Sequence, residues 1–255
     1  MLKISKYVLY DILRNRVVLA YTAFLLVVSF SLFQMEENSS KAVLSLLNVV
    51  LIVVPLVSLV FSTIHWYNSY EFLVLMLTQP VSRKKVLLSE FAGIGSSLVT
   101  AYLVGIGIPV LIYHFNATGL ALLLIGSLLT LVFTSIAFWA SIKSKDKARG
   151  IGAALMLWFY FALIFDGLLL LIIFAFGEYP LEKVILTLST FNPIDLGRIY
   201  LMLQMDVSAL MGYTGATYKE FFGSFGGMLY TFGTLLLWIV VPLLLSFRSF
   251  SKKDL

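Results

Sequence analysis

Apolar residues gather into six long stretches, and the short segments between them carry most of the charges. The stretches run over residues 17–33, 42–64, 91–113, 119–141, 151–176 and 225–247. A helix needs about 20 predominantly apolar residues to cross a bilayer, and a helix satisfies its own backbone hydrogen bonds there. The first stretch is short and needs flanking residues to span. The pattern predicts an all-α integral membrane protein, a single domain over residues 1–255 with six transmembrane helices.

The composition agrees with this interpretation. The chain is 60% hydrophobic and 12% charged, whereas about a quarter of the residues in a soluble domain are charged. It contains no cysteine, which excludes disulfides and thiolate metal sites. Its two histidines, His65 and His114, fall on opposite sides of the predicted membrane and cannot share one ion. We therefore expect no metal site.

The distribution of cations predicts the orientation. Of the 18 lysine and arginine residues, fourteen fall before the first span, between spans 2 and 3, between spans 4 and 5, or after span 6, and the other four are Lys41, Lys183, Arg198 and Lys219. Cytoplasmic loops are the ones enriched in Lys and Arg. Both termini are therefore predicted to be cytoplasmic, in a multi-pass protein of the bacterial inner membrane. The net charge of +5 reflects this topology, and we expect no nucleic-acid partner.

The sequence contains none of the catalytic motifs GxxxxGK[ST], HExxH and GxSxG, whose residues cradle phosphates, bind zinc or activate a serine. We therefore expect no enzyme activity and no cofactor in this chain. It is predicted to be one of two kinds of protein. The first is a passive or ion-coupled membrane protein, and the second is the membrane subunit of a complex in which another chain supplies the energy.

Residues 66–78 are predicted to form a short cytoplasmic helix. Thirteen residues span roughly 20 Å, too short for a bilayer core of about 30 Å. Trp66, Tyr70, Leu73, Val74 and Leu77 share one face at helical spacing. The other face carries Glu71 and three apolar side chains that we expect to be exposed, Phe72, Leu75 and Met76. One interpretation is an overhang of the second span, and the other is a helix that docks on a protein partner.

The segment YEFLVLMLTQPVSRKKVLLSEF, residues 70–91, resembles the cytoplasmic loop of ABC-2-type permeases. The matching positions are Glu71, Leu75, Leu77, Pro80, Ser82 and Arg83. The resemblance implies a type V exporter-like fold with an amphipathic N-terminal arm over residues 1–16 and a coupling helix over residues 66–78. It implies docking of a cytosolic ABC ATPase, which holds the ATP and Mg²⁺, on Tyr70, Glu71, Phe72, Leu75, Met76 and Arg83.

Residues 177–224 form the long outer connection. Asn192 is suited to cap a helix that begins at Pro193, where no backbone N–H is needed. Asp195 favours the first turn and is spaced to pair with Arg198. We expect two short helices lying at the outer surface, as a platform for a partner.

The residues NPIDLGRIYLMLQMDVSALMGYTGA, 192–216, resemble one branch of the ABC-2 permeases, the membrane subunits of the complex that matures the copper centre of nitrous oxide reductase. The resemblance implies a homodimer, a cytosolic ATPase of the NosF type and a periplasmic β-helical subunit of the NosD type. It implies outer partner contacts at Asn192, Asp195, Arg198, Asp206 and Tyr213. Whether copper, a sulfur species or nothing crosses the membrane stays open.

Asp166 lies well inside the fifth apolar stretch, where a charge is costly. It either holds the bundle together as a neutral or paired group or faces a cavity or dimer seam. Since no cation lies in another span core, we expect tyrosine, serine or threonine partners. Three classes of function remain: an ABC permease subunit driven by a separate ATPase, an ion-coupled secondary carrier, and a scaffold that does not transport. Within the first class, export of another substrate is the alternative to copper-site assembly.

Overall fold

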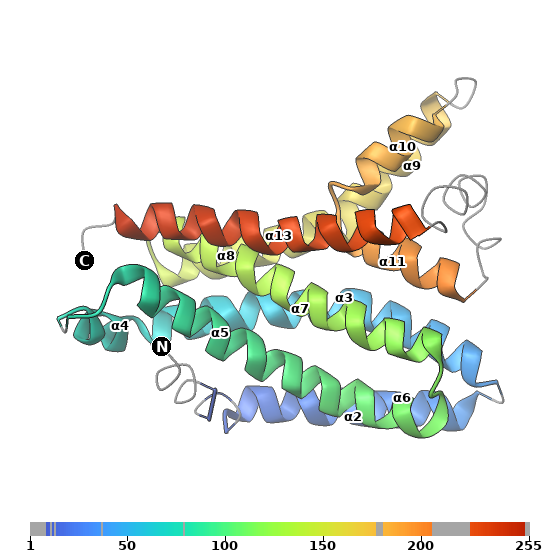
Figure 1. The fold of residues 1–255 in the computed structure, drawn as a ribbon, viewed down its shortest axis with the longest axis horizontal. Helices are drawn as coiled ribbons and strands as arrows, with labels where there is room; N and C mark the ends of the chain where they lie inside the picture. The colour runs from blue at the N-terminus through green and yellow to red at the C-terminus, as the bar shows by residue number, and fades with distance from the viewer. Residues whose placement is uncertain are drawn as a thin grey trace.

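The computed structural model describes residues 9–10, 12, 14–36, 38–78, 80–176, 181–205 and 225–252. Within these residues six helical segments are long and apolar enough to cross a membrane. They lie side by side along the long axis of the molecule, apart from the last part of the fifth segment, which leaves the bundle (Figure 1). The prediction of six spans is confirmed. Most of the N-terminal arm lies outside the described residues, as do residues 177–180 and 206–224 of the outer connection.

The first two spans are α2 (Arg16–Met35) and α3 (Ser39–Asn68). The third combines α5 (Arg83–Tyr102), a π-helical turn η1 (Leu103–Gly107) and α6 (Ile108–Tyr113), and the fourth is α7 (Ala117–Lys143). The fifth combines α8 (Lys147–Phe159), a second π-helical turn η2 (Tyr160–Ile164) and α9 (Phe165–Ala175). The sixth is α13 (Phe225–Ser251). Three short helices complete the described chain: α4 (Tyr70–Leu77), α10 (Glu182–Ser189) and α11 (Pro193–Gln204).

The starts of several spans are set by capping residues. A side-chain oxygen at the N-cap accepts a hydrogen bond from a backbone N–H that has no partner inside the helix. Asn15, Asn38, Asn116 and Asp146 do this for α2, α3, α7 and α8. Because Asn15 stands just before the first apolar stretch, the helix gains the flanking residues that the stretch needed to span.

Helix α7 is the centre of the bundle. It is the most buried of the six spans and packs against α3, α5, α11 and α13. Its buried hydroxyl groups bond to its neighbours, as in the hydrogen bond from Ser135 Oγ to the carbonyl oxygen of Ile239 at 2.6 Å. Polar groups inside an apolar bundle need such partners. The packing therefore fixes α13 and α3 on α7.

Small residues let α2 approach the third span closely. Gly93, Ser97, Ala101 and Gly105 are all buried, and Ser29 Oγ of α2 donates to the carbonyl oxygen of Gly105 at 3.3 Å. These four residues form a small-residue stripe on the third span, and small side chains allow helix backbones to come together.

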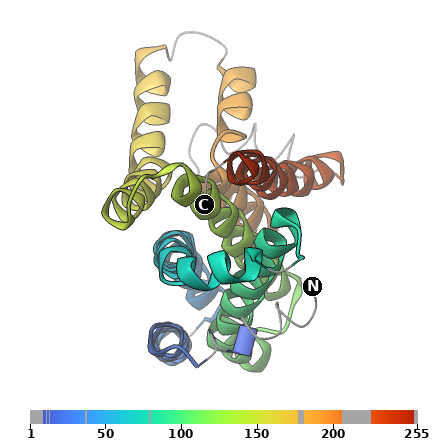
Figure 2. The ribbon, with the colours of Figure 1, turned by 90° about the vertical axis from the view of Figure 1, so that its left-hand side faces the viewer.

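The two ends of the bundle differ. Helix α4 lies at the end where α13 finishes, called here the α4 end, and α11 lies at the opposite end, called the α11 end (Figure 1). Near the α11 end, the fifth span changes direction after η2, and α9 and α10 leave the bundle together on one side (Figures 1 and 2). Bends of this kind are typical of π-helical turns.

Candidate functional site

The structure places three polar or amphipathic sites in line along the bundle: α4 at one end, a pocket beside it, and a buried polar cluster near the other end. Helix α4 begins after a break at Ser69, whose backbone N–H still bonds to the carbonyl oxygen of His65 at 2.9 Å. The sequence predicted one helix over residues 66–78. The structure corrects this, because Trp66 belongs to α3 and is buried against Phe138 and Phe250.

Helix α4 has one buried side and one exposed apolar side. Leu73 is 2% exposed and packs on the bundle, whereas Phe72 is 38% and Leu75 65% exposed, beside the exposed Glu71. Tyr70 is half-buried. Met76 was predicted to be exposed, but it packs against the core. An apolar face that stays exposed at the end of a membrane bundle is typical of a contact site for a protein partner.

Arg83 has a structural role inside the chain. Its Nη1 atom donates to the carbonyl oxygens of Phe250 at 3.3 Å and Ser251 at 3.2 Å. The last carbonyls of a helix have no partner inside it, and a cation there is favourable. Arg83 therefore joins the start of α5 to the end of α13, and its contact with an ATPase stays a prediction.

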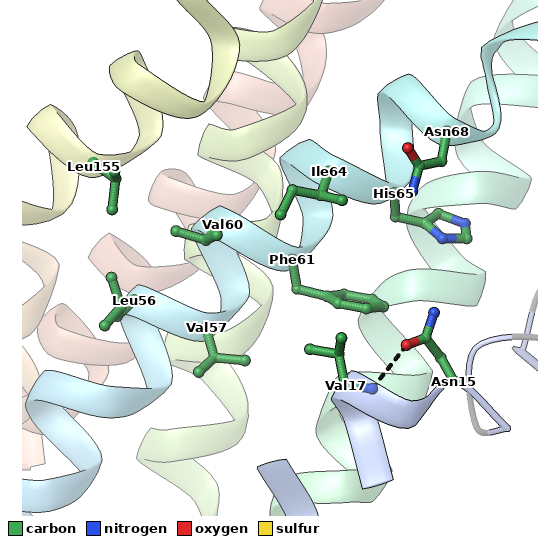
Figure 3. Close-up of a pocket in the computed structure, with 10 residues that line it drawn as sticks. All are labelled: Asn15, Val17, Leu56, Val57, Val60, Phe61, Ile64, His65, Asn68 and Leu155. Atoms are coloured by element: carbon green, nitrogen blue, oxygen red, sulfur yellow. Dashed lines mark hydrogen bonds between the residues drawn. The ribbon is translucent and has the colours of Figure 1, made fainter. Parts of the chain in front are cut away.

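A pocket of about 480 Å³ lies between α2, α3 and α8 (Figure 3). Its apolar walls come from the side chains of Val17, Leu56, Val57, Val60, Phe61, Ile64 and Leu155. Its three polar residues, Asn15, His65 and Asn68, gather on one side of the pocket (Figure 3). Since Asn68 ends α3 beside α4, the polar side of the pocket faces the α4 end.

His65 connects this pocket to the starts of α4 and α5. Its Nε2 atom lies 3.2 Å from Ser69 Oγ and 3.7 Å from Glu90 Oε2. Glu90 is only 2% exposed, and a buried carboxylate needs a charged or hydrogen-bonding partner. Movement of α4 would therefore disturb polar contacts in the wall of the pocket.

A buried polar cluster holds α11 to the bend in the fifth span. It consists of Asp166, Asn192, Asp195 and Arg198, called here the α9–α11 polar cluster. Asn192 caps α11 by accepting a hydrogen bond from the Ile194 N–H at 3.0 Å, and its Nδ2 donates to the carbonyl oxygen of Phe161 in η2 at 2.9 Å. A buried carbonyl needs such a partner. Asn192 therefore stabilises the π-helical turn as well as the helix that it caps.

Arg198 joins the cluster from the other side. Its Nη1 atom lies 2.6 Å from Asp166 Oδ2 and 3.1 Å from Asp195 Oδ1. The predicted Asp195–Arg198 pair is confirmed. The expectation of a tyrosine, serine or threonine partner for Asp166 is wrong, because the partner is an arginine on α11. Sequence reasoning placed Arg198 outside the membrane and had no signal that α11 turns back against the bundle.

The position of α11 also corrects the predicted surface helices. Its residues pack against α3, α7 and α13, and a Cβ on Gly197 would meet Ile125 at 2.9 Å. Asn192 is fully buried and Asp195 is 6% exposed. Both residues were predicted to contact an outer partner, and their burial assigns them instead to holding α11. Asp206 and Tyr213, predicted for the same surface, lie outside the described residues.

Two other observations bear on the chemistry. Among the described residues, no three His, Cys, Asp or Glu side chains are close enough to hold a metal ion together. Burial raises the pKa of Asp195 to about 8, an effect that Arg198 opposes and the Asp166 carboxylate reinforces. The cluster is thus an ionic contact between helices in which burial favours the protonated form of Asp195.

Together, the six apolar spans, the short exposed helix at one end and the helix turned back at the other describe a multi-pass membrane protein. A sequence model of the ABC-2 family transporter proteins matches residues 73–255. The chain belongs to this family.

Two relatives within this family carry the same name. The chain is 28% identical over 277 aligned positions to the "Probable ABC transporter permease protein NosY" of Stutzerimonas stutzeri, covering 98% of this chain and 97% of that protein. It is 33% identical over 150 positions to the protein of the same name from Pseudomonas aeruginosa, covering 55% of this chain and 54% of that protein. The protein is thus a multi-pass ABC-2 permease that is similar to NosY.

Proposed function

We propose that this permease transmits the work of ATP hydrolysis from a separate cytosolic ABC ATPase to the opposite face of the membrane. The observation that carries the proposal is α4, a short helix with Phe72 and Leu75 exposed at the end of the bundle. An amphipathic helix of this kind binds by placing apolar side chains in a groove. The ATPase would hold the ATP and Mg²⁺, with Tyr70 and Glu71 adding polar contacts.

The contacts of the bundle supply a continuous route for movement. From α4 the route runs through Ser69 and His65 to Glu90 on α5. Helices α3 and α5 pack on α7, and α7 packs on α11. Arg198 and Asn192 then join α11 to the bend of the fifth span. Packed helices shift between discrete arrangements instead of deforming continuously, so we propose that the bend at η2 is the element that changes.

The charges support an orientation for this route. The α4 end carries Arg83, Lys84 and Lys85 on α5, the Lys143–Arg149 connection and Arg248 on α13. Cytoplasmic ends of membrane proteins are the ones enriched in such residues. We therefore propose that the α4 end and both termini are cytoplasmic, that the α11 end is periplasmic, and that the membrane is the bacterial inner membrane.

The likeness to NosY supports a more specific assignment. By this likeness the chain would form a homodimer with two ATPases of the NosF type below and a β-helical NosD-type subunit above. The complex would serve the assembly of the copper centre of nitrous oxide reductase. The pocket beside His65 supports a second candidate, export of another substrate, because it offers a solute an amphipathic cavity near the cytoplasmic end.

The docking experiment replaces Phe72 and Leu75 with Asp and measures co-purification of the co-expressed ATPase. The matched control is Phe115→Asp, which changes an exposed phenylalanine in the turn between α6 and α7. We expect the double variant to lose the ATPase while its thermal stability matches that of the control. An ATPase that stays bound to the double variant would refute the docking role of α4.

The copper assignment has its own readout. Co-expressed nitrous oxide reductase is purified from cells carrying each variant, and the absorption spectrum of its copper centre is recorded. We expect the docking variant to leave the centre incomplete and Phe115→Asp to leave it normal. A normal centre in cells that lack the permease would refute the copper assignment without affecting the ATPase assignment.

A further inference from the structure

A second pocket, of about 560 Å³, lies at the α4 end between the start of α5 and the last turns of α13. Its lining consists of Lys84 from α5 and, from α13, Val241, Leu244, Leu245, Phe247, Arg248 and Ser251. The side chains of Val241, Leu244 and Leu245 are exposed. The pocket therefore has an apolar wall that ends at two cationic side chains.

The electrostatic character of this pocket is positive. None of its seven lining residues is acidic, and within the described part of the chain no carboxylate forms an ion pair with Lys84 or Arg248. The negative end of α13 lies nearby, but Arg83 already bonds to its carbonyl oxygens at Phe250 and Ser251. Among the residues that line this pocket, an anion placed between Lys84 and Arg248 would thus meet two cations and no carboxylate.

We propose that this pocket binds an anionic phospholipid, with the phosphate between Lys84 and Arg248 and the acyl chains along Val241, Leu244 and Leu245. Basic pockets between transmembrane helices recognise anionic headgroups in this way. The apolar wall from residue 241 to residue 248 covers seven helical steps, about 10 Å, which suits the upper part of an acyl chain. A soluble phosphate would use the cations and leave this wall uncovered.

The two cations lie on different helices, so a bound lipid would hold these helices together. Lys84 belongs to α5 and Arg248 to α13, so one headgroup bridges two helices next to the position of α4. Arg83 joins the same helices through hydrogen bonds. The lipid would therefore strengthen a contact that the chain already makes, and its binding does not require the proposed ATPase.

The experiment reconstitutes the full chain in nanodiscs of equal parts dioleoylphosphatidylglycerol and dioleoylphosphatidylcholine, then measures retained lipids by native mass spectrometry after release into detergent. The test variant is Lys84→Gln with Arg248→Gln. The control is Lys143→Gln with Lys147→Gln, which removes the same charge from the same end of the bundle outside this pocket. A third variant, Lys84→Arg with Arg248→Lys, keeps both charges.

We expect the wild type, the control and the charge-keeping variant to retain phosphatidylglycerol over phosphatidylcholine, and the test variant to lose this preference. A cation near the membrane surface contributes about 1 kcal/mol, so each lost cation should weaken retention roughly fivefold. Added inorganic phosphate at the same concentration as the lipid should not displace it, because the acyl chains contribute to binding.

Three results would overturn the proposal. One is equal retention of the two lipids by the wild type, and another is an equal loss in the test and control variants. The third result would come from the variant Leu244→Cys, whose single cysteine is the only one in the chain. An oxidised dimer formed through that cysteine in the nanodisc would show that a second copy, and not lipid, covers the pocket.

Discussion

Arg198 on α11 places its Nη1 atom 2.6 Å from Oδ2 of Asp166 on α9, and the same atom lies 3.1 Å from Oδ1 of Asp195. One guanidinium therefore serves two carboxylates. If both carboxylates are ionised, the group carries a net negative charge, which a poorly solvated site disfavours. One bound proton makes it neutral. This arrangement joins the helix that turns back at the α11 end to the span that bends there.

Removing Arg198 should therefore damage the contact more than removing an ordinary surface charge. We expect Arg198→Leu to lower the free energy of unfolding by about 1–3 kcal/mol, because two carboxylates lose a charged hydrogen-bond donor. Arg149→Leu is the control, since the exposed Arg149–Asp146 pair at 3.3 Å should contribute less than about 1 kcal/mol. Thermal unfolding in one detergent measures both variants.

Exchanging the charges of Asp166 and Arg198 tests whether the ion pair itself accounts for the loss of stability in Arg198→Leu. The double variant Asp166→Arg with Arg198→Asp keeps one guanidinium and two carboxylates. We expect it to be more stable than either single variant, because the attraction across α9 and α11 is restored. A double variant as unstable as the sum of the single variants would show that the site depends on side-chain shape instead of charge.

The raised pKa of Asp195 predicts a pH dependence of stability. Burial raises the pKa of Asp195 from an ordinary value of 3.8 to about 8. Between these values the folded state holds a proton that the unfolded state releases, so the stability of the folded state falls as the pH rises from about 4 to about 8. The contribution of this group is constant above that range.

Asp195→Asn should remove this part of the pH dependence, because asparagine stays neutral throughout. We expect the difference in melting temperature between pH 5 and pH 8 to become smaller than in the wild type. The control is Asp146→Asn, which keeps a capping side chain at an exposed position. Equal pH dependence of the wild type and Asp195→Asn would contradict a bound proton at this site.

The spans and their caps could be predicted from the sequence because their causes are local. An apolar run of sufficient length forms a helix in a membrane wherever it occurs, and Asn192 before Pro193 predicts a helix start without reference to other segments. Helical spacing also placed Leu73 on the same face of α4 as other apolar residues. The Asp195–Arg198 ion pair could be predicted from spacing as well, because the two residues are three apart in one helix.

The contacts between distant segments could not be predicted in this way. Arg198 and Asp166 are 32 residues apart, and nothing local shows that α11 packs inside the bundle. Met76 and Arg83 look like surface residues when α4 and the start of α5 are considered alone. Their environment comes from the core and from the end of α13, which the local pattern does not describe.

Asn192 has two partners, which predicts a larger effect than capping alone. Asn192→Ala removes the cap of α11 and the donor to Phe161 in η2. Loss of a cap costs about 1 kcal/mol, and a buried carbonyl left without a partner adds about 1–3 kcal/mol. Asn38→Ala removes the cap of α3 at an exposed position and is the matched control. We expect the Asn192 variant to unfold at the lower temperature, and equal melting temperatures would contradict its role at the bend.

Close packing of α2 against the third span predicts that replacing Gly105 with a larger residue lowers stability. A Cβ on Gly105 would lie 2.6 Å from Leu25 Cβ and 3.2 Å from the carbonyl oxygen of Thr22, both on α2. A backbone carbonyl and a Cβ atom cannot turn away as the end of a side chain can. We therefore expect Gly105→Ala to push the helices apart and to cost about 1–3 kcal/mol.

Gly152→Ala is the control, because a Cβ there has nothing within 4 Å. It should be neutral or stabilise the protein by up to about 1 kcal/mol, since alanine favours the helix more than glycine does. Thermal unfolding of the two variants in the same detergent gives the comparison. If Gly105→Ala is as stable as Gly152→Ala, the α2 contact is not close-packed, and the small-residue stripe on the third span has another cause.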